Sequence, residues 1–166
     1  MKKLYAICCI AAMSAAAHAQ SIKGTYAIQN VQTGMYLRIK DANTKDGTPI
    51  VAYSPVNWKC VTWDFQQQEG QTYALVNLFS HKTMQPQSDA ANGVALEERP
   101  VAASGASQQY DFIPVAKGMY LIRFKGTELY VTPSDAQGAE NTATILAPKN
   151  NSKLQYWTLH EQHPTM

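Results

Sequence analysis

The segment Thr25-Tyr26-Ala27-Ile28-Gln29 has two counterparts further along the chain, Thr72-Tyr73-Ala74-Leu75-Val76 and Met119-Tyr120-Leu121-Ile122-Arg123. The three tyrosines stand 47 residues apart, and each segment alternates with the period of two that is typical of a half-buried strand. Three further sets of apolar positions keep this step: Trp63, Tyr110 and Trp157; Phe65, Phe112 and Leu159; and Leu37, Met84 and Val131. A step that stays constant along the chain indicates three structural repeats.

Each repeat carries the signals of four strands and no convincing helix. Turns follow the first strand and precede the third, at Thr33-Gly34, Ser80-His81 and Gly126-Thr127, and at Asp46-Gly47, Asn92-Gly93 and Asn141-Thr142. The repeats span about 24–70, 71–117 and 118–162, and none can bury an apolar face alone. We therefore expect an all-β fold, a β-trefoil with pseudo-threefold symmetry. A propeller is not expected, because it needs about four or more blades. The remaining alternative is another all-β barrel.

The first 19 residues have the order of a secretory signal peptide. Lys2 and Lys3 precede an apolar run over residues 4–12, and Ala17-His18-Ala19 has the form of a cleavage site. The apolar run is shorter than the roughly 20 residues that span a bilayer, so we expect no membrane span. The prediction is a secreted or periplasmic protein whose residues 20–166 form one domain.

Charge and cysteine usage narrow the function further. Without Lys2 and Lys3 the remaining 12 basic residues balance 12 acidic ones, and basic runs are absent. A general nucleic-acid binder needs clustered positive charge, so nucleic acid is not an expected partner. Only Cys60 remains after cleavage, so no intramolecular disulfide is expected, and the lone thiol is predicted to be buried as a small apolar residue.

Catalytic and metal motifs have little support in the sequence. His160-Glu161-Gln162-His163 is not the helical zinc motif and precedes Pro164, so we expect a solvated tail rather than a metal site. Glu97 and Glu98 are neighbours in a predicted strand and should point to opposite faces, which does not suit paired acid and base catalysis. The sequence therefore predicts a protein that is not an enzyme and uses no cofactor.

Several short motifs carry a resemblance to a known family. They are Tyr26-x-Ile28-x-Asn30, Thr33-Gly34-x-Tyr36-Leu37, Asp46-Gly47-Thr48-Pro49-Ile50 and the Q-x-W motif Gln155-Tyr156-Trp157. The chain resembles the ricin-B-type lectins over residues 24–160. The resemblance implies a trefoil that binds carbohydrate. In galactose-binding members each repeat has an Asp after the Leu of its second strand, an aromatic residue at the end of the third strand, and an Asn-Gln pair before the Q-x-W aromatic. Such a set offers hydrogen bonds to sugar hydroxyls and a flat ring for the apolar sugar face.

In the first repeat these positions hold Arg38, Tyr53, Cys60 and Val61, with Asn57 and Trp58 nearby. The counterparts of Trp58 in the other repeats are Gly105 and Ser152, so it is not a shared core position. It is either an exposed ring for stacking on a ligand or an aromatic cap on one end of the barrel.

The second repeat places Gln85, Arg99, Ser107 and Gln108 at the same four positions, with Glu97 close by. The third repeat has Thr132, Ala147, Leu154 and Gln155, which offer little recognition chemistry. The Asp is missing from all three repeats, so galactose specificity is not implied. The ligand-binding candidates are Arg38, Tyr53, Asn57, Trp58, Gln85, Glu97, Arg99 and Gln108.

Two functions remain open. The favoured one is a lectin whose partner is a glycan or polysaccharide. The other is a trefoil that binds a protein, such as a secreted protease inhibitor, a reading that rests on fold analogy. For that function Asn57-Trp58-Lys59 is a better contact site than the small-residue loop at 102–107.

Overall fold

Twelve strands and four single turns of 3₁₀ helix make up the part of the chain that the computed structural model describes, residues 20–166. The expected signal peptide at residues 1–19 lies outside the described residues. The strands are β1 (Thr25–Asn30), β2 (Tyr36–Ile39), β3 (Ile50–Tyr53), β4 (Thr62–Glu69), β5 (Thr72–Asn77), β6 (Thr83–Pro86), β7 (Leu96–Arg99), β8 (Tyr110–Ala116), β9 (Met119–Phe124), β10 (Leu129–Pro133), β11 (Thr144–Pro148) and β12 (Tyr156–Glu161). The 3₁₀ turns are η1 (Lys40–Ala42), η2 (Lys59–Val61), η3 (Ala106–Gln108) and η4 (Lys153–Gln155).

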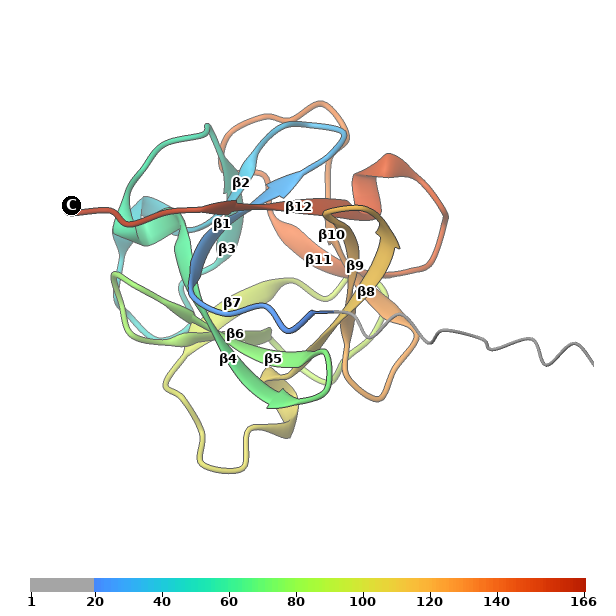
Figure 1. Cartoon of the computed structure of the whole chain (residues 1–166), viewed down its shortest axis with the longest axis horizontal. Helices are drawn as coiled ribbons and strands as arrows, with labels where there is room; N and C mark the ends of the chain where they lie inside the picture. Colours follow the sequence, from blue (N-terminus) through green and yellow to red (C-terminus); the bar gives the residue numbers. More distant parts are fainter. Residues whose placement is uncertain (1–19) are drawn as a thin grey trace, which may run out of the picture.

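Six of the strands close into a barrel. Antiparallel pairing runs around the ring β1, β4, β5, β8, β9 and β12 and back to β1. The other strands form the hairpins β2–β3, β6–β7 and β10–β11, which Figure 1 shows distributed around the ring. Isolated bridges join each hairpin region to the other two: Pro49 to Glu97, Val51 to Ala143, and Ala95 to Ile145. This arrangement is a β-trefoil, as the repeat predicts.

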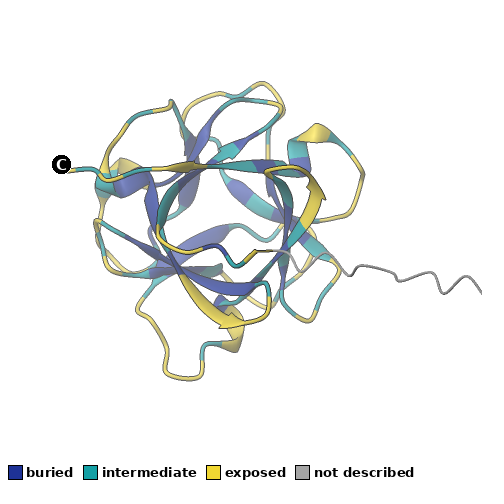
Figure 2. Cartoon of the chain, in the orientation of Figure 1, coloured by how far each residue is buried: buried dark blue, intermediate teal, exposed yellow. Residues whose placement is uncertain are grey.

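The repeated aromatic positions form the centre of the core. Trp63, Tyr110 and Trp157 are at most 1% exposed, and each donates a hydrogen bond from its polar end to the main-chain carbonyl 26 residues earlier. The acceptors are Leu37 at 3.1 Å, Met84 at 3.2 Å and Val131 at 3.0 Å. The prediction that Trp63, Tyr110 and Trp157 are core residues is therefore confirmed. Three of the other repeated positions, Tyr26, Tyr120 and Leu159, are only partly buried and pack against this core. Figure 2 shows the buried residues concentrated in the strands and the exposed ones in the loops.

The turns that open each hairpin are fixed by buried amides in two repeats only. Asn30 Oδ1 accepts from the amide nitrogens of Gln32 and Thr33, and Asn77 Oδ1 accepts from those of Phe79 and Ser80. Asn77 also donates to the carbonyl of Cys60 at 3.1 Å, which ties β5 to η2. Cys60 itself is 5% exposed, so its predicted burial is confirmed.

Candidate functional site

Arg38 and Tyr53 lie together on one face of the β2–β3 hairpin. Tyr36 pairs with Tyr53 and Arg38 with Val51, and residues two apart in a strand share a face. The guanidinium carbon of Arg38 stands 3.9 Å from the centroid of the Tyr53 ring. A cation on an aromatic face at this distance is attracted by about 0.5–2 kcal/mol, so the contact orients both side chains.

Arg38 has no charged partner within residues 20–166. The residue is 8% exposed, and its Nε atom is buried without a hydrogen-bond acceptor. Nη1 and Nη2 also make no hydrogen bond to a described residue, but they keep some contact with solvent. Burying a charge without a partner opposes folding, and the Tyr53 ring offsets only part of this.

Trp58 is the exposed aromatic residue of the first repeat. Its ring centroid is 6.1 Å from that of Tyr53 with a tilt of 33°, and 38% of the residue is exposed. The neighbouring Asn57 is exposed and its side chain makes no hydrogen bond to any described residue. The first-repeat candidates are thus brought together, with two rings and a cation side by side.

The segment 54–58, the Trp58 loop, is held in place from the C-terminal end of the chain. Gln162 donates from Nε2 to the carbonyl of Val56 at 3.0 Å, and its Oε1 accepts from Thr62 Oγ1 at 2.7 Å. Thr62 Oγ1 also lies 2.8 Å from the carbonyl oxygen of Trp58, so its single hydroxyl proton is shared between this oxygen and Gln162 Oε1. Lys59 N, next to the loop, donates to the backbone oxygen of Met166 at 2.6 Å. The expectation of a solvated tail is wrong for Gln162, because its amide is used inside the fold.

An apolar cleft lies beside Trp58. It has a volume of about 270 Å³ and is lined by Ala42, Trp58, Lys59, Cys60, Phe79 and Met166. Phe79 is 41% exposed, so two large apolar side chains flank the opening.

The second-repeat candidates are engaged with one another. Gln108 is 3% exposed and donates from Nε2 to Gln85 Oε1 and to the carbonyl of Pro100, both at 2.9 Å. Its Oε1 accepts from the amide nitrogen of Ala102 at 2.9 Å, so both ends of the Gln108 amide are used internally. Gln85 and Ser107 line a cleft of about 400 Å³ together with residues 86–90 and Phe124.

Glu97 and Arg99 form an ion pair, with Arg99 Nε 2.6 Å from Glu97 Oε1. The pair packs against Gly47 of the first repeat, where a Cβ atom would lie 3.4 Å from Glu97 Oε2. Glu98 lies on the opposite face, paired in register with Met84, so the prediction that the two carboxylates diverge is confirmed. Glu98 is fully buried, and burial raises the pKa of its carboxyl while Ser80 and Lys82 act in the other direction.

The third repeat contains the same buried glutamine arrangement as the second. Gln155 donates to Thr132 Oγ1 at 3.1 Å and to the carbonyl of Pro148 at 2.9 Å, and it accepts from the amide of Asn150 at 2.9 Å. In the first repeat the equivalent position is Val61, which is fully buried. Gln85 and Thr132 each have a glutamine partner, whereas Arg38 at the same position has none.

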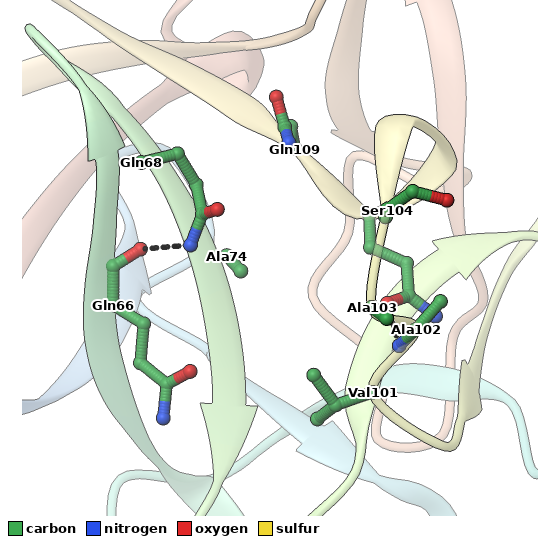
Figure 3. A pocket seen from close by; sticks show the side chains of 10 residues that line it. Gln66, Gln68, Ala74, Val101, Ala102, Ala103, Ser104 and Gln109 are labelled. Atoms are coloured by element: carbon green, nitrogen blue, oxygen red, sulfur yellow. Dashed lines mark hydrogen bonds between the residues drawn. The ribbon is translucent and has the colours of Figure 1, made fainter.

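Sequence reasoning missed a cleft between the first and second repeats. Figure 3 shows it between Gln66 and Gln68 on β4 and the loop at 101–105, with Gln109 at its edge. Its volume is about 400 Å³, and Gln68 Nε2 donates to the carbonyl of Gln66 at 3.1 Å. The run Gln66-Gln67-Gln68 is the one visible signal in the sequence.

Within residues 20–166 no group of three or more His, Cys, Asp or Glu side chains is arranged to hold a metal ion. His160 belongs to β12 and its ring packs 5.9 Å from Tyr36, while His163 contacts Glu161 at 3.2 Å. In the described part of the chain, no helix has the length and apolar character needed to cross a membrane.

The sequence profile of the family described as ricin-type beta-trefoil lectin domain-like matches residues 16–98. A search of curated proteins by sequence gives no significant match. The Rhizoctonia solani agglutinin is similar in structure, with 22% identity, a TM-score of 0.76, and coverage of 85% of this chain and 96% of that one. A ricin B-like lectin from Macrolepiota procera, solved with lactose, has 19% identity and a TM-score of 0.71 over 86% and 99% of the two chains.

The designed threefold-symmetric protein ThreeFoil has 20% identity and a TM-score of 0.77, over 83% of this chain and 99% of its own. At these identities the structural likenesses show the fold. Together with the profile match they agree with the internal repeat, and the chain belongs to the ricin-type beta-trefoil lectin domain-like family.

Proposed function

We propose that the protein is a secreted, non-catalytic lectin that binds carbohydrate at the first repeat. The observation that carries the proposal is the arrangement of Trp58, Tyr53 and Arg38, in which an exposed ring lies beside a second ring and a cation. Sugars are recognised by aromatic rings that stack on their apolar face and by polar groups that bond their hydroxyls. The similar Macrolepiota procera lectin, solved with lactose, supports this class of ligand.

The way the Trp58 loop is held also supports a binding role. Gln162 bonds the carbonyl of Val56, Thr62 Oγ1 lies 2.8 Å from the carbonyl of Trp58, and the next residue, Lys59, bonds Met166, so the loop is held before any ligand arrives. A site that is ordered in advance loses less conformational freedom on binding, which favours affinity.

The carboxylates of the second repeat do not suit a glycosidase. Such enzymes use two carboxyl groups that face each other across the substrate. Glu97 is committed to Arg99, and the carboxyl of Glu98 lies buried on the other face of β7. This supports binding without hydrolysis.

Secretion is the part of the proposal that rests on sequence alone. The Lys2-Lys3 start, the apolar run and the Ala17-His18-Ala19 triplet support cleavage before Gln20. Expression of the full chain in a bacterial host, followed by intact-mass measurement of the exported fraction, should give a protein that begins at Gln20. Full-length protein retained in the cytoplasm would contradict secretion.

A glycan array tests carbohydrate binding directly. The wild-type protein is compared with Trp58→Ala, which removes the exposed ring, and with Gln85→Ala, which alters the second-repeat cleft. We expect binding by the wild type and by Gln85→Ala, and its loss in Trp58→Ala with an unchanged circular dichroism spectrum. Binding lost only in Gln85→Ala would move the site to the second repeat, and a blank array with folded protein would contradict the proposal.

Protein binding is the second candidate, and the apolar cleft beside Trp58 and Phe79 favours it. Exposed apolar side chains that flank a cleft are typical of contact surfaces for proteins. A Phe79→Ser variant separates the two functions, because Phe79 lies in this cleft and not beside Tyr53. If Phe79→Ser keeps glycan binding while Trp58→Ala loses it, the lectin function stands.

A further inference from the structure

From the surroundings of Arg38 we infer that the first-repeat site recognises an anionic group, a carboxylate or a sulfate, carried by a glycan. This rests on the proposed function and names the class of carbohydrate. The anionic group would bind the Arg38 guanidinium, and the sugar ring that bears it would stack on Trp58 beside Tyr53.

Arg38 differs from the other arginines of the chain in its surroundings. The sequence has three, and the other two have carboxylate partners: Arg99 pairs with Glu97 at 2.6 Å, and Arg123 pairs with Asp111 at 3.0 Å and Glu128 at 3.2 Å. Both of those side chains are substantially exposed, at 44% and 32%. Arg38 is the one of the three that is buried, with 8% of the whole residue exposed, and no carboxylate of residues 20–166 forms an ion pair with it. The most buried of the three guanidinium groups is therefore the one without a carboxylate partner.

The threefold pattern of side-chain contacts is broken at Arg38. Gln108 and Gln155 bond the side chains that occupy the position of Arg38 in their own repeats. In the first repeat this glutamine is replaced by Val61, which offers no polar atom. The first repeat therefore differs from the other two in two ways. Arg38 places a cation at the expected binding position, and Val61 replaces the glutamine whose side chain bonds this position in the other repeats.

The Arg38 guanidinium lies on the face of the Tyr53 ring, and Nη1 and Nη2 keep contact with solvent. Carboxylates and sulfates bind the N–H edge of a guanidinium, often through two parallel hydrogen bonds. Trp58 stands beside the same ring, at 6.1 Å, where it can contact the sugar.

No acidic side chain among residues 20–166 forms an ion pair with Arg38. Among residues 20–166, Glu140 is the acid that a side-chain hydrogen bond joins to the Trp58 loop, and its Oε1 accepts from Ser54 Oγ at 2.5 Å rather than from Arg38. The counter-charge for Arg38 is therefore expected from the ligand.

The experiment compares acidic glycans with their neutral parents. An array that carries uronate-bearing, sialylated and sulfated glycans beside the same glycans without the charge is probed with the wild-type protein. The strongest acidic glycan and its parent are then titrated by calorimetry against Arg38→Gln, Arg38→Lys and Lys153→Gln. Lys153 is an exposed lysine at the equivalent of Lys59 in the third repeat, so its variant controls for the loss of one positive charge.

We expect the wild type to bind the acidic glycan at least about tenfold more tightly than the neutral parent. Arg38→Gln should abolish this preference, Arg38→Lys should keep part of it, and Lys153→Gln should keep all of it. The carboxylate and sulfate arms of the array show which anion the site prefers.

Equal affinity for acidic and neutral glycans, with loss of both in Trp58→Ala, would overturn this inference and leave the proposed function standing. Absence of binding to any glycan would overturn both. The comparison within the wild-type protein decides the point even if Arg38→Gln does not fold.

Discussion

Arg38 lies 3.9 Å from the centre of the Tyr53 ring, at the position where the second and third repeats hold side chains bonded to a buried glutamine. The pair joins β2 to β3 near the Trp58 loop, and it places a positive charge under a half-buried ring. Proteins tend to keep features that oppose stability where function needs them.

Arg38→Met should not destabilise the protein. The substitution removes a buried charge without a partner and keeps an apolar side chain against Tyr53, so the free energy of unfolding is expected to stay equal or to rise by about 1 kcal/mol. Urea denaturation measures it. As a control, Arg123→Met breaks contacts with Asp111 and Glu128 and should cost about 1 kcal/mol. A clear loss of stability in Arg38→Met would assign Arg38 a structural role.

Gln155→Leu should destabilise the fold. The variant removes an amide that makes three hydrogen bonds in the third repeat, and it leaves the carbonyl of Pro148 and the amide of Asn150 without a partner. A loss of about 2 kcal/mol in the free energy of unfolding is expected. Gln137→Leu, at an exposed position, should change it by less than about 0.5 kcal/mol. Equal effects of the two substitutions would contradict the assigned role of Gln155.

The folding stability of the Glu98→Gln variant, relative to that of the wild type, should increase as the pH rises. Burial raises the pKa of Glu98 above its ordinary value of 4.5, so the folded state favours the protonated carboxyl. This contribution is fully present below pH 4.5 and is lost as the pH rises through the folded-state pKa. The variant has no such carboxyl and avoids the loss.

Thermal unfolding of both proteins between about pH 4 and pH 8, a window that begins just below the ordinary carboxyl pKa, measures this effect. The Tm of Glu98→Gln minus the Tm of the wild type should increase as the pH rises above the ordinary carboxyl pKa. A difference that stays constant across this range would mean that Glu98 titrates in the folded protein as it does in the unfolded chain.

Gln162→Ala should weaken glycan binding without unfolding the protein. Its amide links Thr62 to the carbonyl of Val56 and so positions the Trp58 loop from a distance. Greater freedom of the loop is expected to weaken affinity about three- to tenfold. Calorimetry and amide hydrogen exchange over residues 54–58 measure the two effects together. Weaker binding with unchanged exchange in the loop would mean that Gln162 acts in some other way.

The fold could be predicted from the sequence because its determinants repeat. The 47-residue step identifies Trp63, Tyr110 and Trp157 as core residues, and all three prove buried with the same hydrogen bond. Alternation correctly separates Glu97 and Glu98, but the expectation of a half-buried strand is wrong for β5, which is buried at all six positions.

The details of the site depend on contacts between distant segments, which no local pattern contains. The contact between Arg38 and Tyr53 requires the register of β2 and β3. The support of the Trp58 loop comes from Gln162, 106 residues after Val56. The glutamine cleft of Figure 3 forms only because the loop at 101–105 folds beside β4. The sequence therefore predicted which first-repeat residues belong to the candidate site, but not the contacts that hold them in position.

The most direct test of the central claim uses the three tryptophan side chains as reporters. The indole N–H groups of Trp63 and Trp157 are bonded inside the core, whereas that of Trp58 has no partner in the described chain and lies on an exposed ring. A ¹⁵N–¹H spectrum recorded during titration with the best glycan from the array should show the Trp58 indole signal moving and the other two unchanged. Glycan binding that leaves the Trp58 signal in place would contradict a site at the first repeat.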